Sequence, residues 1–334
     1  MIEGKLISVI IPVFNTEKYI VSCLKSLVNQ TYVNFEVIIV DDGSTDKSCE
    51  VIKEFLNSTS LEYKIFKKTN GGVSSARNLG ITNSNGKYLL FLDSDDFVEN
   101  VLFEKIEAVT TENNVDMIFY GFDMVNEQHE AMWSYEDNFR YIQEILSGKK
   151  IMKDILDEKV LIWTSSVMYR REFVIENNIK YLETAYNGED QAFTYKALYR
   201  CSKIFNINQV LAHYVQRHGS ISHSNSLKRI TVLDAFEDLC NYMQIYNEED
   251  SLIKEIKQKK IPSEVIYALT QIVSKDNKKQ IKNLLKMQNI RSSLRPFKLN
   301  NLNKKDFKLF VRVKLALLTP TLFYYYYVLK KYKS

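Results

Sequence analysis

The first hundred residues alternate short apolar runs with amphipathic stretches, and this alternation restricts the chain to a small set of folds. Apolar, β-branched runs of strand length lie at residues 6–13, 35–40, 63–66 and 87–92. Stretches with apolar residues three and four apart, the spacing of one helix face, lie at residues 17–28, 46–56 and 73–81. Strands that alternate with helices predict a mostly parallel sheet flanked by helices, the α/β class.

The notable polar residues of this region all follow predicted strands. In chain order they are Asn15, the pair Asp41 and Asp42, Asn70, and the cluster from Asp93 to Asp96. Ligands of open α/β sheets bind at the carboxyl ends of the strands. These positions therefore predict a ligand site at that edge of the sheet.

The stretch LLFLDSDDF at residues 89–97 places Asp93, Asp95 and Asp96 directly after an apolar strand. Carboxylates this close repel each other, and a cation commonly holds such a group together. Mg²⁺ and Mn²⁺ prefer oxygen ligands, so either ion suits the cluster. Helix capping is the alternative, and it suits Asp96 better than the other two because a cap needs fewer carboxylates.

Two familiar nucleotide-binding motifs are missing from the sequence. There is no G-x-x-x-x-G-K-[ST] loop, and PVFNTEKY stands after the first strand where a G-x-G-x-x-G turn would lie. This disfavours a P-loop NTPase and a standard dinucleotide oxidoreductase. Phosphate charge must then be met in another way, and a cation held by carboxylates is the obvious candidate.

The pattern beyond residue 100 is looser. Helices are predicted at 101–109, 139–157 and 189–199, and strands at 116–120, 166–169 and 210–215. From residue 226 onward the pattern is helical with little strand signal. We therefore expect an α/β domain over residues 1–225 and a mainly helical region over 226–334.

Five stretches in this order resemble a known family: VIIPVFNTEKYIVSCLKSLVNQTY, FEVIIVDDGSTDKS, KTNGGVSSARNLGI, GKYLLFLDSDDF and GEDQAF. They resemble the family-2 glycosyltransferases with the GT-A fold, of the bacterial kind that builds capsular, exo- or cell-wall polysaccharides. The resemblance covers residues 6–100 and a patch near 190, and it thins beyond residue 110.

The resemblance implies a role for each matching residue. Asp93-Ser94-Asp95 matches the D-x-D motif, in which Asp95 ligates a divalent metal, Mn²⁺ or Mg²⁺, that bridges the diphosphate of the donor. Asp190 matches the catalytic base. The residues implied to bind the nucleotide sugar are Val13, Phe14, Asn15, Glu17, Asp42, Asn70, Arg77, Asp93 and Ser94.

Simpler structural roles compete with three of these assignments. Asp42 also suits a plain turn, Arg77 a surface helix, and Asp190 the start of the following helix.

The resemblance implies the activity of an inverting hexosyl- or N-acetylhexosaminyl-transferase. Such an enzyme moves a sugar from a nucleotide donor, here expected to be a UDP-sugar, to a saccharide or lipid-linked saccharide. Two other classes stay open from the sequence: a sugar-1-phosphate nucleotidyltransferase, and a non-catalytic partner subunit of another transferase. Release of pyrophosphate would identify the first, and full activity of an Asp190→Asn variant would favour the second.

Further candidates come from the stretch HYVQRHGSIS, which resembles the family segment that closes over the diphosphate. It makes Arg217 and Ser220 secondary candidates and His213 a weak one. His213, His218 and His223 are spaced by five, which fits neither a helix face nor a strand, so a loop of solvated histidines is favoured over a metal site. Trp163 could stack on an acceptor sugar, but its apolar surroundings favour the core.

Charge divides the chain unevenly. Residues 1–253 carry 25 Lys and Arg against 37 Asp and Glu, and residues 254–334 carry 20 against 4. The 15 residues of 315–329 have no charge, but they are too few to span a bilayer and Pro320 interrupts them. We expect this basic, aromatic tail to attach peripherally to a membrane surface; a helix packed on the protein or in a dimer is the alternative.

The remaining features concern compartment and partners. The four cysteines are scattered without a Cys-x-x-Cys pair, and the start of the chain does not read as a signal peptide. Both favour a cytoplasmic protein with free thiols, on the inner face of the cell membrane if the tail attaches. The basic tail has no recognisable nucleic-acid-binding module and the front is acidic, so no nucleic acid is expected. Homo-oligomerisation stays open.

Overall fold

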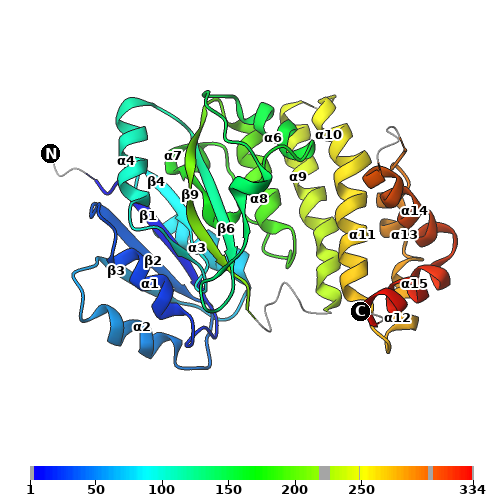
Figure 1. The fold of residues 1–334 in the computed structure, drawn as a ribbon, viewed down its shortest axis with the longest axis horizontal. Coiled ribbons are helices and arrows are strands. Elements are labelled where there is room, and N and C mark those ends of the chain that lie inside the picture. The colour runs from blue at the N-terminus through cyan, green and yellow to red at the C-terminus, as the bar shows by residue number, and fades with distance from the viewer. Residues whose placement is uncertain (1–3, 218–225, 248, 300–303, 333–334) are drawn as a thin grey trace. The chain divides into compact units, whose positions relative to one another are not determined.

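The computed structural model describes residues 4–217, 226–247, 249–299 and 304–332 (Figure 1). The chain divides into two compact units. The first comprises Met1–Glu183 with Phe193–His218, and the second comprises Thr184–Ala192 with Gly219–Ser334. The domain boundary expected at residue 225 lies outside the described residues and stays a prediction.

The predicted parallel half of the sheet is confirmed. Strand β1 (Ile7–Val13) lies between β2 (Phe35–Asp41) and β4 (Tyr88–Phe91), and β3 (Tyr63–Lys67) follows β2 at the edge. All four run parallel, because helices α1 (Ile20–Val28), α2 (Ser48–Leu56) and α3 (Val73–Asn83) return the chain between them. β1 and β2 are buried along their whole length, as expected for mostly apolar central strands of a parallel sheet.

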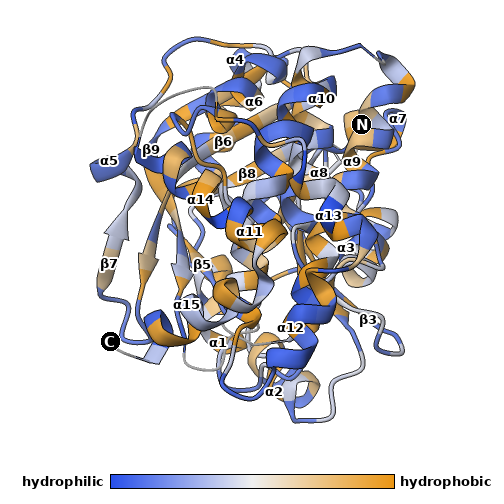
Figure 2. Cartoon of the chain, turned by 90° about the vertical axis from the view of Figure 1, so that its right-hand side faces the viewer, coloured by the Kyte–Doolittle hydropathy of each residue, from blue (hydrophilic) through white to orange (hydrophobic). Residues whose placement is uncertain are grey.

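The second half of the sheet is mixed. β8 (Val167–Arg170) pairs antiparallel with both β4 and β6 (Met117–Val125), and β9 (Ile204–Val215) pairs parallel with β6. The short strands β5 (Phe97–Val98) and β7 (Ala131–Ser134) lie antiparallel to β9 and β6. A mixed sheet flanked by helices confirms the predicted GT-A-like α/β class. Figure 2 shows β6 in mainly hydrophobic colours.

The remaining helices up to residue 200 confirm most of the predictions. α4 (Leu102–Glu112) and α8 (Glu189–Arg200) lie where helices were expected, while α5 (Tyr135–Asn138) and α7 (Arg171–Glu176) were not predicted. The helix predicted over 139–157 is wrong in its first half, since only α6 (Gly148–Leu156) is helical. Residues 139–147 follow β9 instead: the Ile142 N–H donates to Asn206 Oδ1 (2.8 Å), and Leu146 bridges to Ile204.

Glu36 joins the amino ends of the parallel strands. Its carboxylate is almost fully buried and accepts from Ser8 Oγ of β1 (2.8 Å), Lys64 Nζ of β3 (2.9 Å) and the N–H of Asn85 before β4 (2.6 Å). Burial alone would raise the pKa of Glu36, but the bonds from Lys64, Ser8 and Asn85 outweigh burial and lower it. One charged hydrogen-bond network therefore links the amino ends of β1, β2 and β3 and the segment before β4.

The regular elements in the described residues of the second unit are all helical. In chain order these elements are η3 (Leu227–Thr231), α9 (Val232–Tyr246), α10 (Ser251–Glu255), a π-helical turn η4 (Ile256–Lys260), α11 (Ile261–Ile272), α12 (Lys278–Leu284), α13 (Gln288–Leu294), α14 (Lys304–Leu318) and α15 (Pro320–Tyr332). α11 packs on α9, α13 and α14, and its buried face includes Val265, Ile266 and Leu269. Within the described chain, no helix combines the length and apolar character needed to cross a bilayer.

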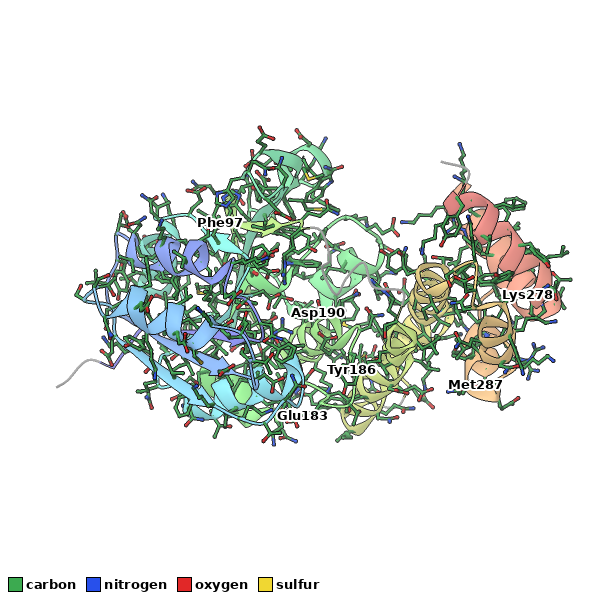
Figure 3. All side chains as sticks on the ribbon, turned by 90° about the horizontal axis from the view of Figure 1, so that it is seen from below. Phe97, Glu183, Tyr186, Asp190, Lys278 and Met287 are labelled. Carbon is green, nitrogen blue, oxygen red and sulfur yellow. The ribbon has the colours of Figure 1, made fainter. Side chains whose placement is uncertain are left out.

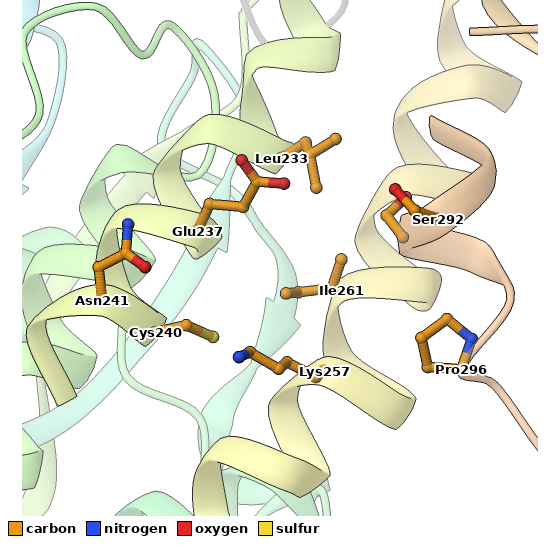
Figure 4. A pocket seen from close by; sticks show the side chains of 9 residues that line it. Leu233, Glu237, Cys240, Asn241, Lys257, Ile261, Ser292 and Pro296 are labelled. Carbon is orange, nitrogen blue, oxygen red and sulfur yellow. The ribbon is translucent and has the colours of Figure 1, made fainter. Parts of the chain in front are cut away.

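A pocket of about 300 Å³ opens among the helices of the second unit (Figure 4). Glu237 and Cys240 line it from α9, Lys257 from η4 and Ser292 from α13. Burial, with Asp234 nearby, raises the pKa of Glu237, and burial raises the pKa of Cys240 to about 11. A Cys240 thiol in this state is protonated and chemically quiet at neutral pH.

We expect Glu36→Gln to destabilise the first unit in a pH-dependent way. Because the folded-state pKa of Glu36 is lowered, its stabilisation is present above the unfolded-state pKa and is lost as pH falls through the folded value. The free energy of unfolding should fall by about 1–3 kcal/mol near neutral pH and by much less in acid. Urea unfolding at both pH values measures this, with the exposed Glu54→Gln as the control. Equal stability of the variant and the parent at neutral pH would contradict the role of the network.

Candidate active site

The loops after β1 and β2 are held together by side chains predicted to bind a nucleotide. Asn15 adopts a left-handed backbone (φ 53°), which Asn tolerates, and its Oδ1 accepts from the Thr45 N–H (2.8 Å). Glu17 Oε2 accepts from the Lys47 N–H (2.9 Å). Asn15 and Glu17 therefore fix the two loops, and their assignment to a base and ribose pocket stays a prediction. Phe14, beside them, is 44% exposed, whereas Val13 is buried at the end of β1.

Asp42 anchors the next loop. Its buried carboxylate accepts from Lys68 Nζ (2.6 Å) and from the N–H groups of Gly71 (2.9 Å) and Gly72 (2.7 Å). This goes beyond a plain turn, because it fixes the N-terminus of α3 against the end of β2. Asn70, at the tip of the same loop, is exposed. Contact of Asp42 or Asn70 with a base stays a prediction.

Gly43 makes the close approach of these two loops feasible. Its φ is +81°, and an added Cβ would lie 2.9 Å from the Asn70 backbone nitrogen. A larger residue would therefore be strained and would also push the Asn70 loop away.

The aspartates follow β4, and each has a different partner. Asp93 Oδ1 accepts from Arg77 Nη2 of α3 (2.7 Å), and Asp95 Oδ2 accepts from Arg217 Nε (2.5 Å). Arg77 is buried, so the competing interpretation of it as a surface helix residue is wrong. Ser94 is buried between the two aspartates. The structure therefore brings together four of the candidates that the sequence suggested: Arg77, Asp93, Asp95 and Arg217.

Asp96 has a structural role that differs from helix capping. Its Oδ2 accepts from Ser165 Oγ (3.0 Å), and its Oδ1 accepts from the Val215 N–H of β9 (3.1 Å). The side chain is fully buried, so it cannot contact a solvent-borne ligand directly. Asp96 ties the end of β4 to β9 and to the 3₁₀ turn η1 (Thr164–Ser166).

The cluster carries more negative charge than its surroundings offset. Burial and then the neighbouring Asp93 raise the pKa of Asp95, although Arg217 opposes the shift. Burial, followed by Asp95 and Asp93, raises the pKa of Asp96 well above its usual range. An added cation would relieve this repulsion.

The residues fit a hard divalent cation. Asp93 and Asp95 present carboxylate oxygens, the donors that Mg²⁺ and Mn²⁺ prefer. No group of three or more His, Cys, Asp or Glu within the described residues is arranged to hold a metal by itself. Two carboxylates leave several positions of a six-ligand shell to water or to oxygens of a bound phosphate.

The two arginines of the cluster are themselves stacked on tyrosines. The Arg217 guanidinium lies 4.4 Å from the centre of the Tyr19 ring, and that of Arg77 lies 5.2 Å from the Tyr181 ring. These contacts hold both cations at the carboxyl edge of the sheet, where a phosphate would need them.

His213 does not belong to a solvated loop, as the sequence suggested. It lies in β9 opposite Phe97, stacks on that ring (4.5 Å) and contacts Glu99 Oε1 through Nε2 (2.7 Å). The histidine spacing was misleading here, because β9 extends through residue 215 and confirms the strand predicted over 210–215, which contains His213. His218, Ser220 and His223 lie outside the described residues.

Trp163 packs on Tyr214 (4.8 Å between ring centres) and Phe122 (6.0 Å), and it is partly buried. This packing agrees with the predicted role in the core. All four cysteines are free thiols, as expected.

Asp190 belongs to the second unit, in the first turn of α8 (Figure 3). Its Oδ1 accepts from the Gln191 N–H (2.7 Å), so a helix-start role is present. Gly188 precedes it with φ +79°, and an added Cβ there would lie 2.8 Å from Val232. The turn that carries Asp190 therefore requires glycine on both conformational and steric grounds. Its role as catalytic base stays a prediction.

Sequence reasoning missed several groups of this site. Lys68 was not singled out as the partner of Asp42, although it lies only two residues before the NGG loop. Ser165 and the Val215 backbone, which satisfy Asp96, carry no local sequence signal because both lie far along the chain. Among described residues, the buried hydroxyls of Thr16 and Ser74 lack a hydrogen-bond partner beside these loops.

Comparison with known proteins decides the family. The model of the family described as glycosyl transferase family 2 matches residues 8–177, which is half of the chain. The chain belongs to glycosyltransferase family 2. It is a glycosyltransferase with the fold and the polar carboxyl edge described above.

Three relatives of this family 2 enzyme illustrate its range. Glycosyltransferase GlyG of Streptococcus pneumoniae is 30% identical over 65% of this chain and 73% of its own. A cholesterol galactosyltransferase of Borreliella burgdorferi is 30% identical over 75% of this chain and 71% of its own. The crystal structure of Staphylococcus aureus TarS 1–349 in complex with UDP-GlcNAc is 20% identical, covers 98% of this chain and 91% of that one, and has a TM-score of 0.65. That similarity shows the fold alone.

We expect Asp96→Asn to stabilise the metal-free enzyme near neutral pH. The folded-state pKa of Asp96 is raised, so its ionisation costs stability as pH rises from the unfolded-state value through the folded value. An amide can still accept from Val215 and donate to Ser165, and it carries no charge. The free energy of unfolding should rise by about 1 kcal/mol or more near neutral pH and not in acid.

Thermal or urea unfolding in chelator measures this effect, with the exposed Asp137→Asn as the control. A variant less stable than the parent at neutral pH would show that Asp96 is not held as an uncompensated buried carboxyl.

Proposed function

We propose that this glycosyltransferase moves a hexose or N-acetylhexosamine from a UDP-sugar to a saccharide or lipid-linked saccharide during synthesis of a surface polysaccharide. One observation carries the proposal: Asp93 and Asp95 lie at the carboxyl end of β4, within reach of Arg77 and Arg217. Alternating carboxylates and guanidinium groups can bind a metal and a diphosphate together.

The donor would lie across the carboxyl ends of β1, β2 and β4. The exposed Phe14 ring offers an apolar surface for the base, and Asp42 and Asn70 lie on the loops around it. The structure of TarS with UDP-GlcNAc supports a UDP-sugar because the folds are similar. We propose residues 1–225 as the catalytic domain that contains this site, with 226–334 as a helical region following it.

Asp93 and Asp95 would hold Mn²⁺ or Mg²⁺, which neutralises charge on the leaving diphosphate when bound. Arg77 and Arg217 would add fixed positive charge beside the same oxygens. Asp190 would take the proton from the acceptor hydroxyl as that oxygen attacks the anomeric carbon. The bond from this carbon to the diphosphate breaks in the same step, and UDP leaves with the bonding electrons. One displacement inverts the configuration, so an α-linked donor gives a β-glycoside.

The relatives support this stereochemistry but not one acceptor. TarS is named as a poly(ribitol-phosphate) β-N-acetylglucosaminyltransferase, and this name indicates a β-linkage. The Borreliella burgdorferi relative is named for cholesterol. Because these acceptors differ so much, the acceptor of this enzyme must be identified by assay. A lipid-linked acceptor would place the enzyme in the cytoplasm, at the inner face of the membrane.

Membership of family 2 disfavours a sugar-1-phosphate nucleotidyltransferase. A non-catalytic partner role would require that Asp190 be dispensable, which the experiment below examines.

We expect one UDP-sugar from a panel to yield free UDP in the presence of Mn²⁺, slowly without acceptor. Asp95→Ala should abolish this metal-dependent release of UDP. Asp190→Asn should lower kcat by about 10²–10⁴-fold with little change in UDP binding, because only proton transfer is lost. The exposed Asp276→Asn is the matched control.

Two results would contradict the proposal. One is metal-independent binding of UDP by calorimetry that Asp95→Ala leaves unchanged. The other is full transfer activity of Asp190→Asn.

A further inference from the structure

The last two helices of the chain each expose a stripe of large apolar side chains. On α15, the positions 322, 325, 329 and 332 are spaced by three and four and so share one face, which carries Leu322, Tyr325, Leu329 and Tyr332. Leu322 and Leu329 are 58% and 54% exposed. Tyr326 flanks this stripe and is also exposed. A soluble helix normally presents polar residues here.

The opposite face of α15 is fixed to the second unit. Phe323, Tyr324 and Tyr327 are buried, and Tyr324 Oη donates to the carbonyl oxygens of Ser274 (3.0 Å) and Lys275 (2.7 Å). The four consecutive tyrosines at positions 324–327 therefore divide into two buried residues, Tyr324 and Tyr327, and two exposed ones, Tyr325 and Tyr326. α15 therefore packs on the second unit through a separate apolar face, and its exposed stripe is not needed for that packing.

α14 repeats the pattern with lysines included. Phe307, Val311, Lys314 and Leu318 are spaced by four, three and four, and all four are exposed. Val313 and Ala316, on the other side, are buried. α14 and α15 follow each other across Thr319 and pack together.

Positive charge surrounds these stripes. Residues 278–332 contain 14 Lys and Arg and a single acidic residue, Asp306, which is buried. Lys304, Lys308 and Lys330 are exposed on α14 and α15. On neighbouring segments, Lys278 Nζ lies 4.4 Å from the centre of the Tyr325 ring and Lys275 Nζ lies 4.5 Å from that of Tyr332.

We propose that the exposed faces of α14 and α15 form a docking surface for an anionic lipid bilayer, on which the helices lie in the plane of the headgroups. Leucine and phenylalanine side chains would enter the acyl boundary, while tyrosines stay at the headgroup level, where a ring and a hydroxyl meet different surroundings. Lysines around them would meet lipid phosphates and carboxylates.

Charge favours a membrane over a second copy of the chain. A two-fold interface brings one patch against the same patch of the partner. The lysines of α14, Lys304, Lys308 and Lys314, would then lie opposite their own equivalents. The single acidic side chain among the described residues of α14, Asp306, is buried and could not offset their charge. An anionic bilayer supplies the missing negative charge at every point of the surface. It also has an apolar interior along its whole surface for inserted leucine and phenylalanine side chains.

Flotation of the full chain with vesicles tests the proposal. We expect binding to phosphatidylglycerol-containing vesicles, weaker binding to phosphatidylcholine alone, and loss of binding at high salt. Lys304→Glu/Lys308→Glu/Lys314→Glu should lower the partition coefficient by about 100-fold or more. Leu322→Gln/Leu329→Gln should lower it by about 10-fold or more, since both lose apolar insertion.

Matched controls separate the surface from net charge and from general apolarity. Lys25→Glu/Lys53→Glu/Lys105→Glu reverses three exposed lysines of the first unit, and Ile245→Gln removes a side chain that is 79% exposed on α9. Both should leave vesicle binding unchanged, and circular dichroism should be the same for every variant.

The proposal is overturned if the parent chain does not bind anionic vesicles, or if the control variants lose as much binding as the α14 and α15 variants. It is also overturned if sedimentation shows a dimer that only the α14 and α15 variants dissociate and no vesicle binding. The inference does not rest on the proposed donor: a chain that binds vesicles but releases no UDP keeps the docking surface and overturns the proposed function.

Discussion

Three carboxylates lie together at the end of β4, and the rest of the first unit must supply groups that compensate their negative charge. Asp96 is buried and Asp95 is partly buried beside Asp93, so the negative charge of each group makes ionisation of the others less favourable. The groups that offset this cost lie 16, 69, 119 and 122 positions away along the chain, in Arg77, Ser165, Val215 and Arg217. Both the parallel and the mixed halves of the sheet must form before the cluster is compensated.

The amino ends of the parallel strands stabilise the sheet, whereas their carboxyl ends carry the candidate ligand-binding residues. At the amino ends, the Glu36 carboxylate has three hydrogen-bond donors and needs nothing from solvent or ligand. At the carboxyl ends, Phe14 and Asn70 are exposed, and burial together with Asp93 raises the pKa of Asp95, a shift that a bound cation would oppose. A fold of this kind can carry different donors and acceptors by changing one edge, because its stability is secured at the other.

The sequence predicted the features that depend on local periodicity, and it failed where a distant strand decides the structure. The first four strands and three helices follow from the apolar spacing alone. Residues 139–147 have helical spacing, yet their backbone bonds to Asn206 and Ile204 of β9, which no local pattern reveals. His213 was expected in a loop because its spacing to other histidines was considered and not its strand partner Phe97. The aspartate motif was recognised, but the partners that hold it, Ser165 above all, are set by the fold.

The tyrosine run of α15 has a consequence for how the chain can vary. Its four identical residues have unequal surroundings, with Tyr324 and Tyr327 packed inside and Tyr325 and Tyr326 outside. A helix turns by about 100° per residue, so adding or deleting one tyrosine would barely alter the composition while rotating everything after it to a new face. The length of the run is therefore under tighter constraint than the identity of its exposed residues. The number of residues in this repetitive tract determines which of the following side chains face the protein.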